Sequence, residues 1–145
     1  MRDRSPIQSV AMLVGLVFLL VGILGFIPGI TSNYDDLKFA GHDSDAQLLG
    51  IFDTSILHNI VHLLFGVAGL AMARTVALAR NYLVFGGAIY LVLFLYGLLV
   101  GQDSAANFVP VNTADDILHL VLGIGMIGLG LALSRTRTGT VAGTR

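Results

Sequence analysis

Two short segments of the sequence place histidines beside polar or acidic residues at helical spacing. His58 and His62 are four residues apart, so they share one face if the segment is helical. In the second segment, Asp115 and Asp116 precede His119 by four and three residues, so the imidazole can meet either carboxylate. Together with one amide, these side chains form a candidate polar cluster: His58, Asn59, His62, Asp115, Asp116 and His119.

Three kinds of chemistry would use these residue types. Two neutral imidazoles on facing helices can ligate a haem iron. Three histidines together with an aspartate can bind a divalent metal ion. A cluster of histidine and aspartate can also relay protons, because histidine titrates near neutral pH. All three stay open as alternatives to a purely structural role.

A structural role is the leading interpretation of the cluster. Polar residues inside a membrane commonly hold helices together through hydrogen bonds. On this interpretation His62 bonds Asn59, His58 or a loop carbonyl. His119 correspondingly bonds one of the two aspartates that precede it. We therefore assign no catalytic residue, no metal ligand and no cofactor from the sequence.

Motifs of other enzyme classes are missing or misplaced. The chain has no cysteine, which excludes disulfides, thiolate-bound zinc and covalently attached haem. Residues 123–128 fit G-x-G-x-x-G, but they lie inside an apolar segment with no preceding strand, so a dinucleotide site is rejected. The net charge is −1 and no basic stripe is present, so no nucleic-acid partner is expected. We expect a protein that is not an enzyme.

The elements that carry the cluster are apolar helices. Apolar residues make up 55% of the chain and charged residues only 12%, with a mean hydropathy of +0.84, which indicates a surface solvated by lipid. About 20 apolar residues cross the hydrocarbon core as a helix, because a lone strand would leave its backbone unpaired. Four segments meet this description, at about residues 7–27, 57–73, 82–100 and 117–133. Ser55 and Thr113 fit helix N-caps.

Basic residues predict the orientation of these four spans. Only Lys38 lies in a loop on the far side of the first span, whereas the other basic residues share one side, which should be the cytoplasm. These residues are Arg2, Arg4, Arg74, Arg80, Arg135, Arg137 and Arg145. Both termini are therefore expected in the cytoplasm. The short turn at residues 74–81 predicts that the second and third spans are antiparallel neighbours.

The second and fourth spans repeat one another. Residues 59–66 (NIVHLLFG) match residues 116–123 (DILHLVLG), and upstream His58 aligns with Asp115 and Ser55 with Asn112. Each of these spans is entered from an outer loop. The chain therefore reads as two helical hairpins in the same orientation, a parallel repeat about an axis along the membrane normal.

Three segments of the sequence resemble a known bacterial family. These are residues 25–31 (GFIPGIT), 57–66 (LHNIVHLLFG) and 111–119 (VNTADDILH), and together they are similar to the membrane family catalogued as domain of unknown function 4383. The resemblance covers about residues 8–133. It implies a four-helix membrane protein found mainly in actinobacteria and cyanobacteria, and it implies no activity. Asp116 stands where that family is expected to carry Asn.

The sequence thus predicts an all-α membrane protein, a four-transmembrane-helix bundle built from two repeated helical hairpins. Residues 1–133 form the single domain, and residues 134–145 are expected to be a disordered cytoplasmic tail. The leading function is a non-enzymatic accessory or scaffold protein. The alternatives are a transporter or a proton- or metal-conducting protein that uses the polar cluster, and a bis-histidine haem protein. Expected partners are the lipid bilayer and a homo-oligomer or larger membrane complex.

Overall fold

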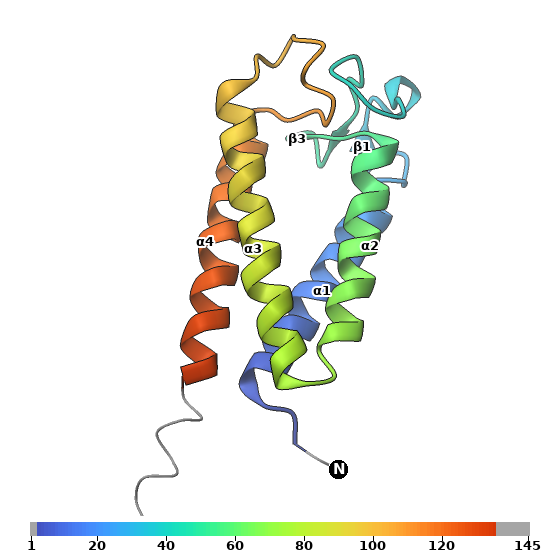
Figure 1. The fold of residues 1–145 in the computed structure, drawn as a ribbon. Helices are drawn as coiled ribbons and strands as arrows, with labels where there is room; N and C mark the ends of the chain where they lie inside the picture. Colours follow the sequence, from blue (N-terminus) through green and yellow to red (C-terminus); the bar gives the residue numbers. More distant parts are fainter. Residues whose placement is uncertain (1–2, 136–145) are drawn as a thin grey trace, which may run out of the picture.

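The computed structural model describes residues 3–135, and within them the chain forms four helices that lie side by side (Figure 1). Their lower ends lie near the N-terminus, and the longer loops gather at the opposite end. The helices are α1 (Pro6–Leu24), α2 (Ile56–Met72), α3 (Val76–Leu99) and α4 (Thr113–Arg135).

Four helices lie at the four predicted spans, and several of their ends differ from the prediction. The third helix begins six residues before the expected Tyr82, because Thr75 caps it by accepting a hydrogen bond from the Leu78 amide at 3.2 Å. The fourth begins at Thr113 instead of Ile117 and continues through Ser134 and Arg135, which had been assigned to the tail. The rest of the predicted tail, residues 136–145, lies outside the described residues.

The surface of the bundle is that of a membrane protein. In the described part of the chain, α1, α3 and α4 are long and apolar enough to cross a bilayer, and α2 is also apolar but has 17 residues. Large apolar side chains point outward from the helices, and Leu64, Phe85 and Val92 are each more than 60% exposed. A soluble bundle would not leave so many large apolar side chains in water, whereas lipid solvates them.

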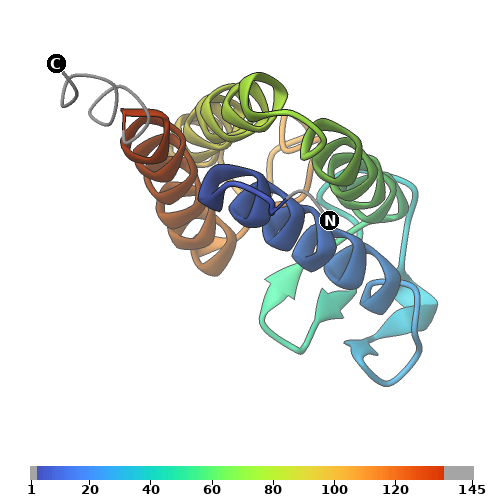
Figure 2. The ribbon, with the colours of Figure 1, turned by 90° about the horizontal axis from the view of Figure 1, so that it is seen from below.

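The four helices are paired as two hairpins. The first helix packs mainly against α2, and α3 packs mainly against α4 (Figures 1 and 2). The second and third helices, predicted as neighbours, meet to a smaller extent, through aromatic side chains. The Tyr82 hydroxyl donates to the Phe65 carbonyl oxygen at 3.0 Å, and the two rings lie 5.8 Å apart. Close backbone contact is thus confined to the helix pairs within each hairpin.

Glycines make the same contact in both hairpins. A Cβ atom on Gly15 would lie 2.9 Å from the carbonyl oxygen of Gly66, and one on Gly87 would lie 2.8 Å from that of Gly123. Real Cβ atoms do not approach backbone oxygen so closely, so the helices of each hairpin meet at these glycines. The aligned pair Gly66 and Gly123 therefore occupies equivalent places, which supports the predicted repeat.

The equivalence extends to the outer ends of the hairpins. Gly25 of the first hairpin faces the side chain of Asn59, and Gly97 of the second faces that of Asp116. The N-caps also correspond, because Ser55 Oγ accepts from the His58 amide at 3.1 Å and Asn112 Oδ1 accepts from the Asp115 amide at 3.0 Å. Asn112, and not the predicted Thr113, is therefore the N-cap of α4.

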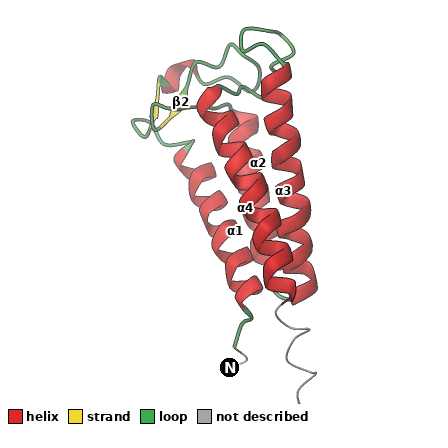
Figure 3. Cartoon of the chain, turned by 90° about the vertical axis from the view of Figure 1, so that its left-hand side faces the viewer, coloured by secondary structure: helices red, strands yellow, loops and turns green. Residues whose placement is uncertain are grey.

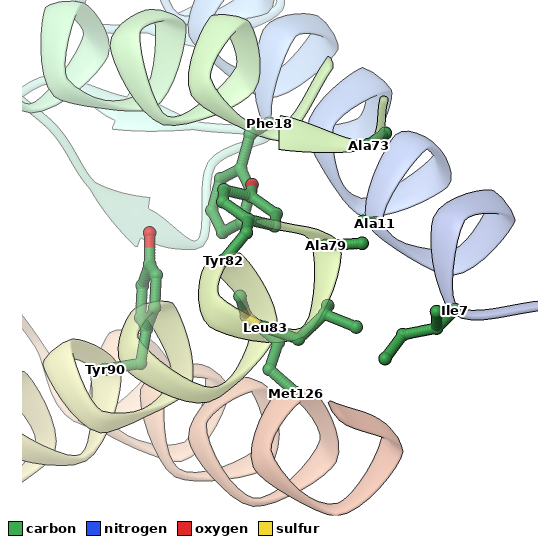
Figure 4. Close-up of a cluster of buried hydrophobic side chains, with 9 residues drawn as sticks. All are labelled: Ile7, Ala11, Phe18, Ala73, Ala79, Tyr82, Leu83, Tyr90 and Met126. Carbon is green, nitrogen blue, oxygen red and sulfur yellow. The ribbon is translucent and has the colours of Figure 1, made fainter. Parts of the chain in front are cut away.

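The buried core lies between the two hairpins and toward the end near the N-terminus. Figure 4 shows its side chains, which come from all four helices or their ends. They are Ile7, Ala11, Phe18, Ala73, Ala79, Tyr82, Leu83, Tyr90 and Met126.

A small sheet caps the opposite end of the bundle. It has three antiparallel strands in the order β1 (Thr31–Ser32), β2 (Gln47–Leu48) and β3 (Phe52–Asp53), with a 3₁₀ turn at Tyr34–Asp36. Figure 3 shows the strands and loops gathered above the helix ends. These strands have two residues each and were not predicted from the sequence.

Candidate functional site

Three histidines lie together beneath this cap. The rings of His58 and His62, one turn apart on α2, are 4.3 Å from centroid to centroid, and the ring of His119 on α4 lies 6.4 Å from that of His58. His58 and His119 are buried, and His62 is half-buried. The structure therefore brings together the histidines of both sequence motifs, across the interface between the hairpins.

Two aromatic residues complete a closed circuit of rings. Phe18 of α1 lies 5.7 Å from His62, and Tyr90 of α3 lies 5.3 Å from His119. Phe18 and Tyr90 stack on one another, with centroids 5.4 Å apart and an interplanar angle of 22°. Tyr90 and Phe18 each stand three residues after a contact glycine, Gly87 and Gly15 respectively. Each hairpin therefore contributes one aromatic ring packed against one histidine, Phe18 with His62 and Tyr90 with His119. The two aromatic rings contact each other between the hairpins.

Phe18 and Tyr90 were missed by the sequence analysis. An aromatic residue inside an apolar span carries no signature of its own. Extending the repeat from the second helix of each hairpin to the first would have found them, because Gly15, Leu19 and Gly25 have the same spacing as Gly87, Leu91 and Gly97.

The hydrogen bonds predicted for the histidines are not present among residues 3–135. The Nδ1 atoms of all three rings are buried and have no hydrogen-bond partner there. Asn59, the expected partner of His62, instead accepts a hydrogen bond from Thr54 Oγ1 at 2.6 Å. Its side chain turns toward Gly25 inside the first hairpin, whereas the histidines turn toward the other hairpin.

The two aspartates have different surroundings, and no hydrogen bond joins either of them to His119 within the described chain. Asp115 Oδ2 accepts from the backbone amides of Asp53 and Asn112, at 3.1 and 3.0 Å. Asp116 turns into the second hairpin toward Gly97, and its buried Oδ1 has no partner in that part of the chain. The predicted cluster is thus divided, with Asn59 and Asp116 inside their own hairpins and the histidines between the hairpins.

Asp115 and Asn112 attach the cap to the second hairpin. Besides the Asp53 amide held by Asp115, the Asn112 Nδ2 atom donates to the Ile51 carbonyl oxygen at 2.8 Å. The Asp53 amide and the Ile51 carbonyl both belong to the loop that connects α1 and α2 of the first hairpin. These bonds therefore join the two hairpins at their outer ends.

Two cavities adjoin the histidines. The larger, about 300 Å³, lies between α1 and α4 and is lined by apolar side chains together with His62, His119 and Tyr90. The smaller, about 90 Å³, lies beneath the cap and is lined in part by Asp53, His58 and Asp115. His62 lines both, so the two cavities are neighbours across its ring.

A metal site would need several ligating side chains close together. Among residues 3–135, no three His, Asp or Glu side chains are placed to hold one metal ion. The remaining histidine, His42, lies in the cap, where its Nε2 atom is 3.3 Å from Asp43 Oδ1. The described part of the chain therefore contains no cluster of three ligands for a metal ion.

A known family model matches most of the chain. The model of the family described as "Domain of unknown function (DUF4383)" matches residues 8–132. No curated protein and no solved structure matches the chain.

Proposed function

The chain belongs to the DUF4383 family of membrane proteins, and we propose that it serves as a non-enzymatic accessory or scaffold protein of the bacterial inner membrane. In this role it associates with itself or with other membrane proteins. Both termini would lie in the cytoplasm, because the basic residues flank the helix ends on that side.

One observation carries the proposal: Asp115, one of the six candidate residues, works together with Asn112 to join the two hairpins. The Asp115 carboxylate binds two backbone amides, one of them in the cap, and Asn112 binds the cap a second time. A carboxylate that accepts such bonds from fixed backbone amides is held in place by them. The outer ends of the helices are consequently joined into one unit that can present a fixed surface to a partner.

The broad apolar surface supports the same role. Lipid-facing side chains on the helices offer area to other transmembrane helices, for which small residues are the usual contact points. Gly125 and Gly128 of α4 have open space beside them, since an added Cβ would meet nothing within 4 Å. This face of α4 is therefore the best-suited surface for a neighbouring helix.

A second candidate function is proton conduction through the histidines. It is favoured by the row of ionisable side chains along the two cavities, from Asp53 and Asp115 through His58 to His62 and His119. A bis-histidine haem site is a further alternative, and it would give the purified protein a Soret band.

Purification and reconstitution of the full chain separate these functions. The scaffold proposal expects no Soret band, a proton leak in liposomes equal to that of empty vesicles, and a discrete complex larger than one chain when native membranes are cross-linked. A double variant, His62→Asn with His119→Asn, should change none of these results, like the control His42→Asn in the cap. A leak or a Soret band that the double variant loses and the control keeps would overturn the proposal, and so would a chain that stays single after cross-linking.

A further inference from the structure

The larger cavity has the composition of a binding site for a lipid-soluble molecule. Its volume of about 300 Å³ is at the lower end of the range for small-molecule pockets, and its walls are apolar apart from two imidazoles and one phenol. Along α1 it extends from Leu13 to Val21, eight residues, which is about 12 Å at the helical rise. It is therefore a narrow slot that can take one hydrocarbon chain.

The cavity opens toward lipid between the two hairpins. Three of its lining side chains are also on the outer surface, Leu13 at 61%, Val17 at 49% and Leu118 at 38% exposure. These residues lie on α1 and α4, within helices that are apolar enough to cross a bilayer. A ligand would therefore enter sideways from the membrane and not from water.

The polar end of the cavity holds imidazoles whose hydrogen-bonding capacity is unused. His62 and His119 both line it, and the structure gives neither ring a hydrogen-bond partner among residues 3–135. Buried polar groups normally have partners, so two such rings beside one cavity point to a ligand. Nδ1 is enclosed in both rings, so a ligand cannot reach it. Nε2 also has no partner in the described chain and is not fully enclosed, so it is the nitrogen that a ligand in the cavity can meet.

Charge selects a neutral head group. Among residues 3–135, no Lys or Arg lines either cavity, and the ionisable neighbours beyond His62 are His58 and the acids Asp53 and Asp115. An anionic head would be repelled by these carboxylates and would find no cation to pair with. Neutral imidazoles and a phenol are instead suited to a carbonyl or a hydroxyl group.

We propose that this cavity binds a neutral lipid with one apolar chain and a carbonyl- or hydroxyl-bearing head, with the head between His62 and His119 and the chain between α1 and α4. Isoprenoid quinones and long-chain alcohols both have this chemistry. The site is separate from the Asp115 and Asn112 bonds that join the hairpins, so it can fail without affecting the proposed scaffold role.

The test uses the full chain in neutral-lipid nanodiscs with ¹⁵N-labelled histidine. Four probes are titrated: decylubiquinone, 1-dodecanol, dodecane without a head group, and dodecyl phosphate with an anionic one. The imidazole signals of His62 and His119, assigned with the variants His62→Phe and His119→Phe, should shift saturably with decylubiquinone or dodecanol, and the His42 signal should not. Whichever of the two binds more tightly identifies the source of the head group.

Two matched variants locate the binding. Val17→Trp places an indole in the mouth of the cavity, whereas Leu16→Trp places one at 47% exposure outside the lining. Val17→Trp should weaken probe binding about tenfold or more, equivalent to about 1.4 kcal/mol, and Leu16→Trp should leave it unchanged. His62→Phe keeps the ring and should weaken binding by about threefold to tenfold, the loss of one hydrogen bond.

Any of four outcomes would overturn the proposal. Equal binding of dodecane would show that no head group is recognised. Tighter binding of dodecyl phosphate would show that the charge argument is wrong. Unchanged histidine signals with all four probes, or equal effects of the two tryptophan variants, would show that the cavity is not the site.

Discussion

The contact between Gly15 and Gly66 allows a prediction with a worked magnitude. A Cβ on Gly66 would lie 2.7 Å from the Leu19 backbone nitrogen and 2.8 Å from the Gly15 carbonyl oxygen, neither of which can move without shifting α1. Overpacking of this kind costs about 1–3 kcal/mol. We therefore expect Gly66→Ala to lower the unfolding free energy by about that amount, and Gly66→Leu by more.

Two other glycines of α4 serve as comparisons for this loss of stability: Gly123, which contacts α3, and Gly125, which contacts no neighbouring helix. The nearest atoms to a Cβ on Gly123 belong to the flexible side chain of Leu91, and the Gly87 carbonyl oxygen lies at 3.0 Å, so Gly123→Ala should cost less than Gly66→Ala. Gly125→Ala meets nothing within 4 Å and should be neutral or stabilising, because alanine favours the helix. Reversible unfolding in mixed detergent micelles gives the three values. The reasoning is refuted if Gly66→Ala is as stable as Gly125→Ala.

Three further predictions concern the polar residues beneath the cap. Asp115→Ala should cost about 1–3 kcal/mol and speed hydrogen exchange at the Asp53 and Asn112 amides, which lose their acceptor; unchanged exchange would mean that the carboxylate does not hold the cap. Asp116→Asn should raise the melting temperature, because it removes a buried acid whose Oδ1 has no partner among residues 3–135, and a lower melting temperature would contradict this. His62→Phe should change the unfolding free energy by less than about 1 kcal/mol, since the imidazole has no protein partner there to leave unsatisfied; a loss of several kcal/mol in thermal or chemical unfolding would reveal a bond absent from the structure.

The helices and their pairing follow from local features of the sequence. The spans of α1, α3 and α4 are long and apolar enough to be recognised alone, and the shorter α2 is recognised through its match with α4. Residues 59–66 match residues 116–123 because the first and last residue of each segment make equivalent contacts. Asn59 and Asp116 each fill the space beside a glycine, and Gly66 and Gly123 each meet the neighbouring helix. Positions that make equivalent contacts in the two hairpins therefore carry the same or similar residues.

The direction of individual side chains could not be predicted in the same way. His62 lies three residues after Asn59, close enough on the helix for a hydrogen bond, but Asn59 finds Thr54 Oγ1 and the gap at Gly25. That choice depends on the cap, whose two-residue strands have no periodicity to detect. Asn112 was likewise passed over as an N-cap because Thr113 fits the same preference.

The larger cavity arises from the packing of whole hairpins. Glycines bring α1 close to α2 and α3 close to α4, whereas α1 and α4 line the cavity with larger side chains such as Leu13, Val17 and Leu118. A gap of this kind depends on the volumes of residues far apart in the sequence. It therefore appears only once the four helices are placed in space.

The two hairpins should cross the membrane in the same orientation. Both outer loops, and the histidines beneath the cap, should then lie toward the outer face. Since the chain has no cysteine, single cysteines can be placed at Asp43 in the cap, at Asp103 in the loop between α3 and α4, and at Arg74 between α2 and α3. A membrane-impermeant maleimide added to intact cells should label Asp43→Cys and Asp103→Cys, and it should label Arg74→Cys only after the membrane is opened. Labelling of Arg74→Cys from outside, or of only one of the two outer positions, would contradict the parallel arrangement.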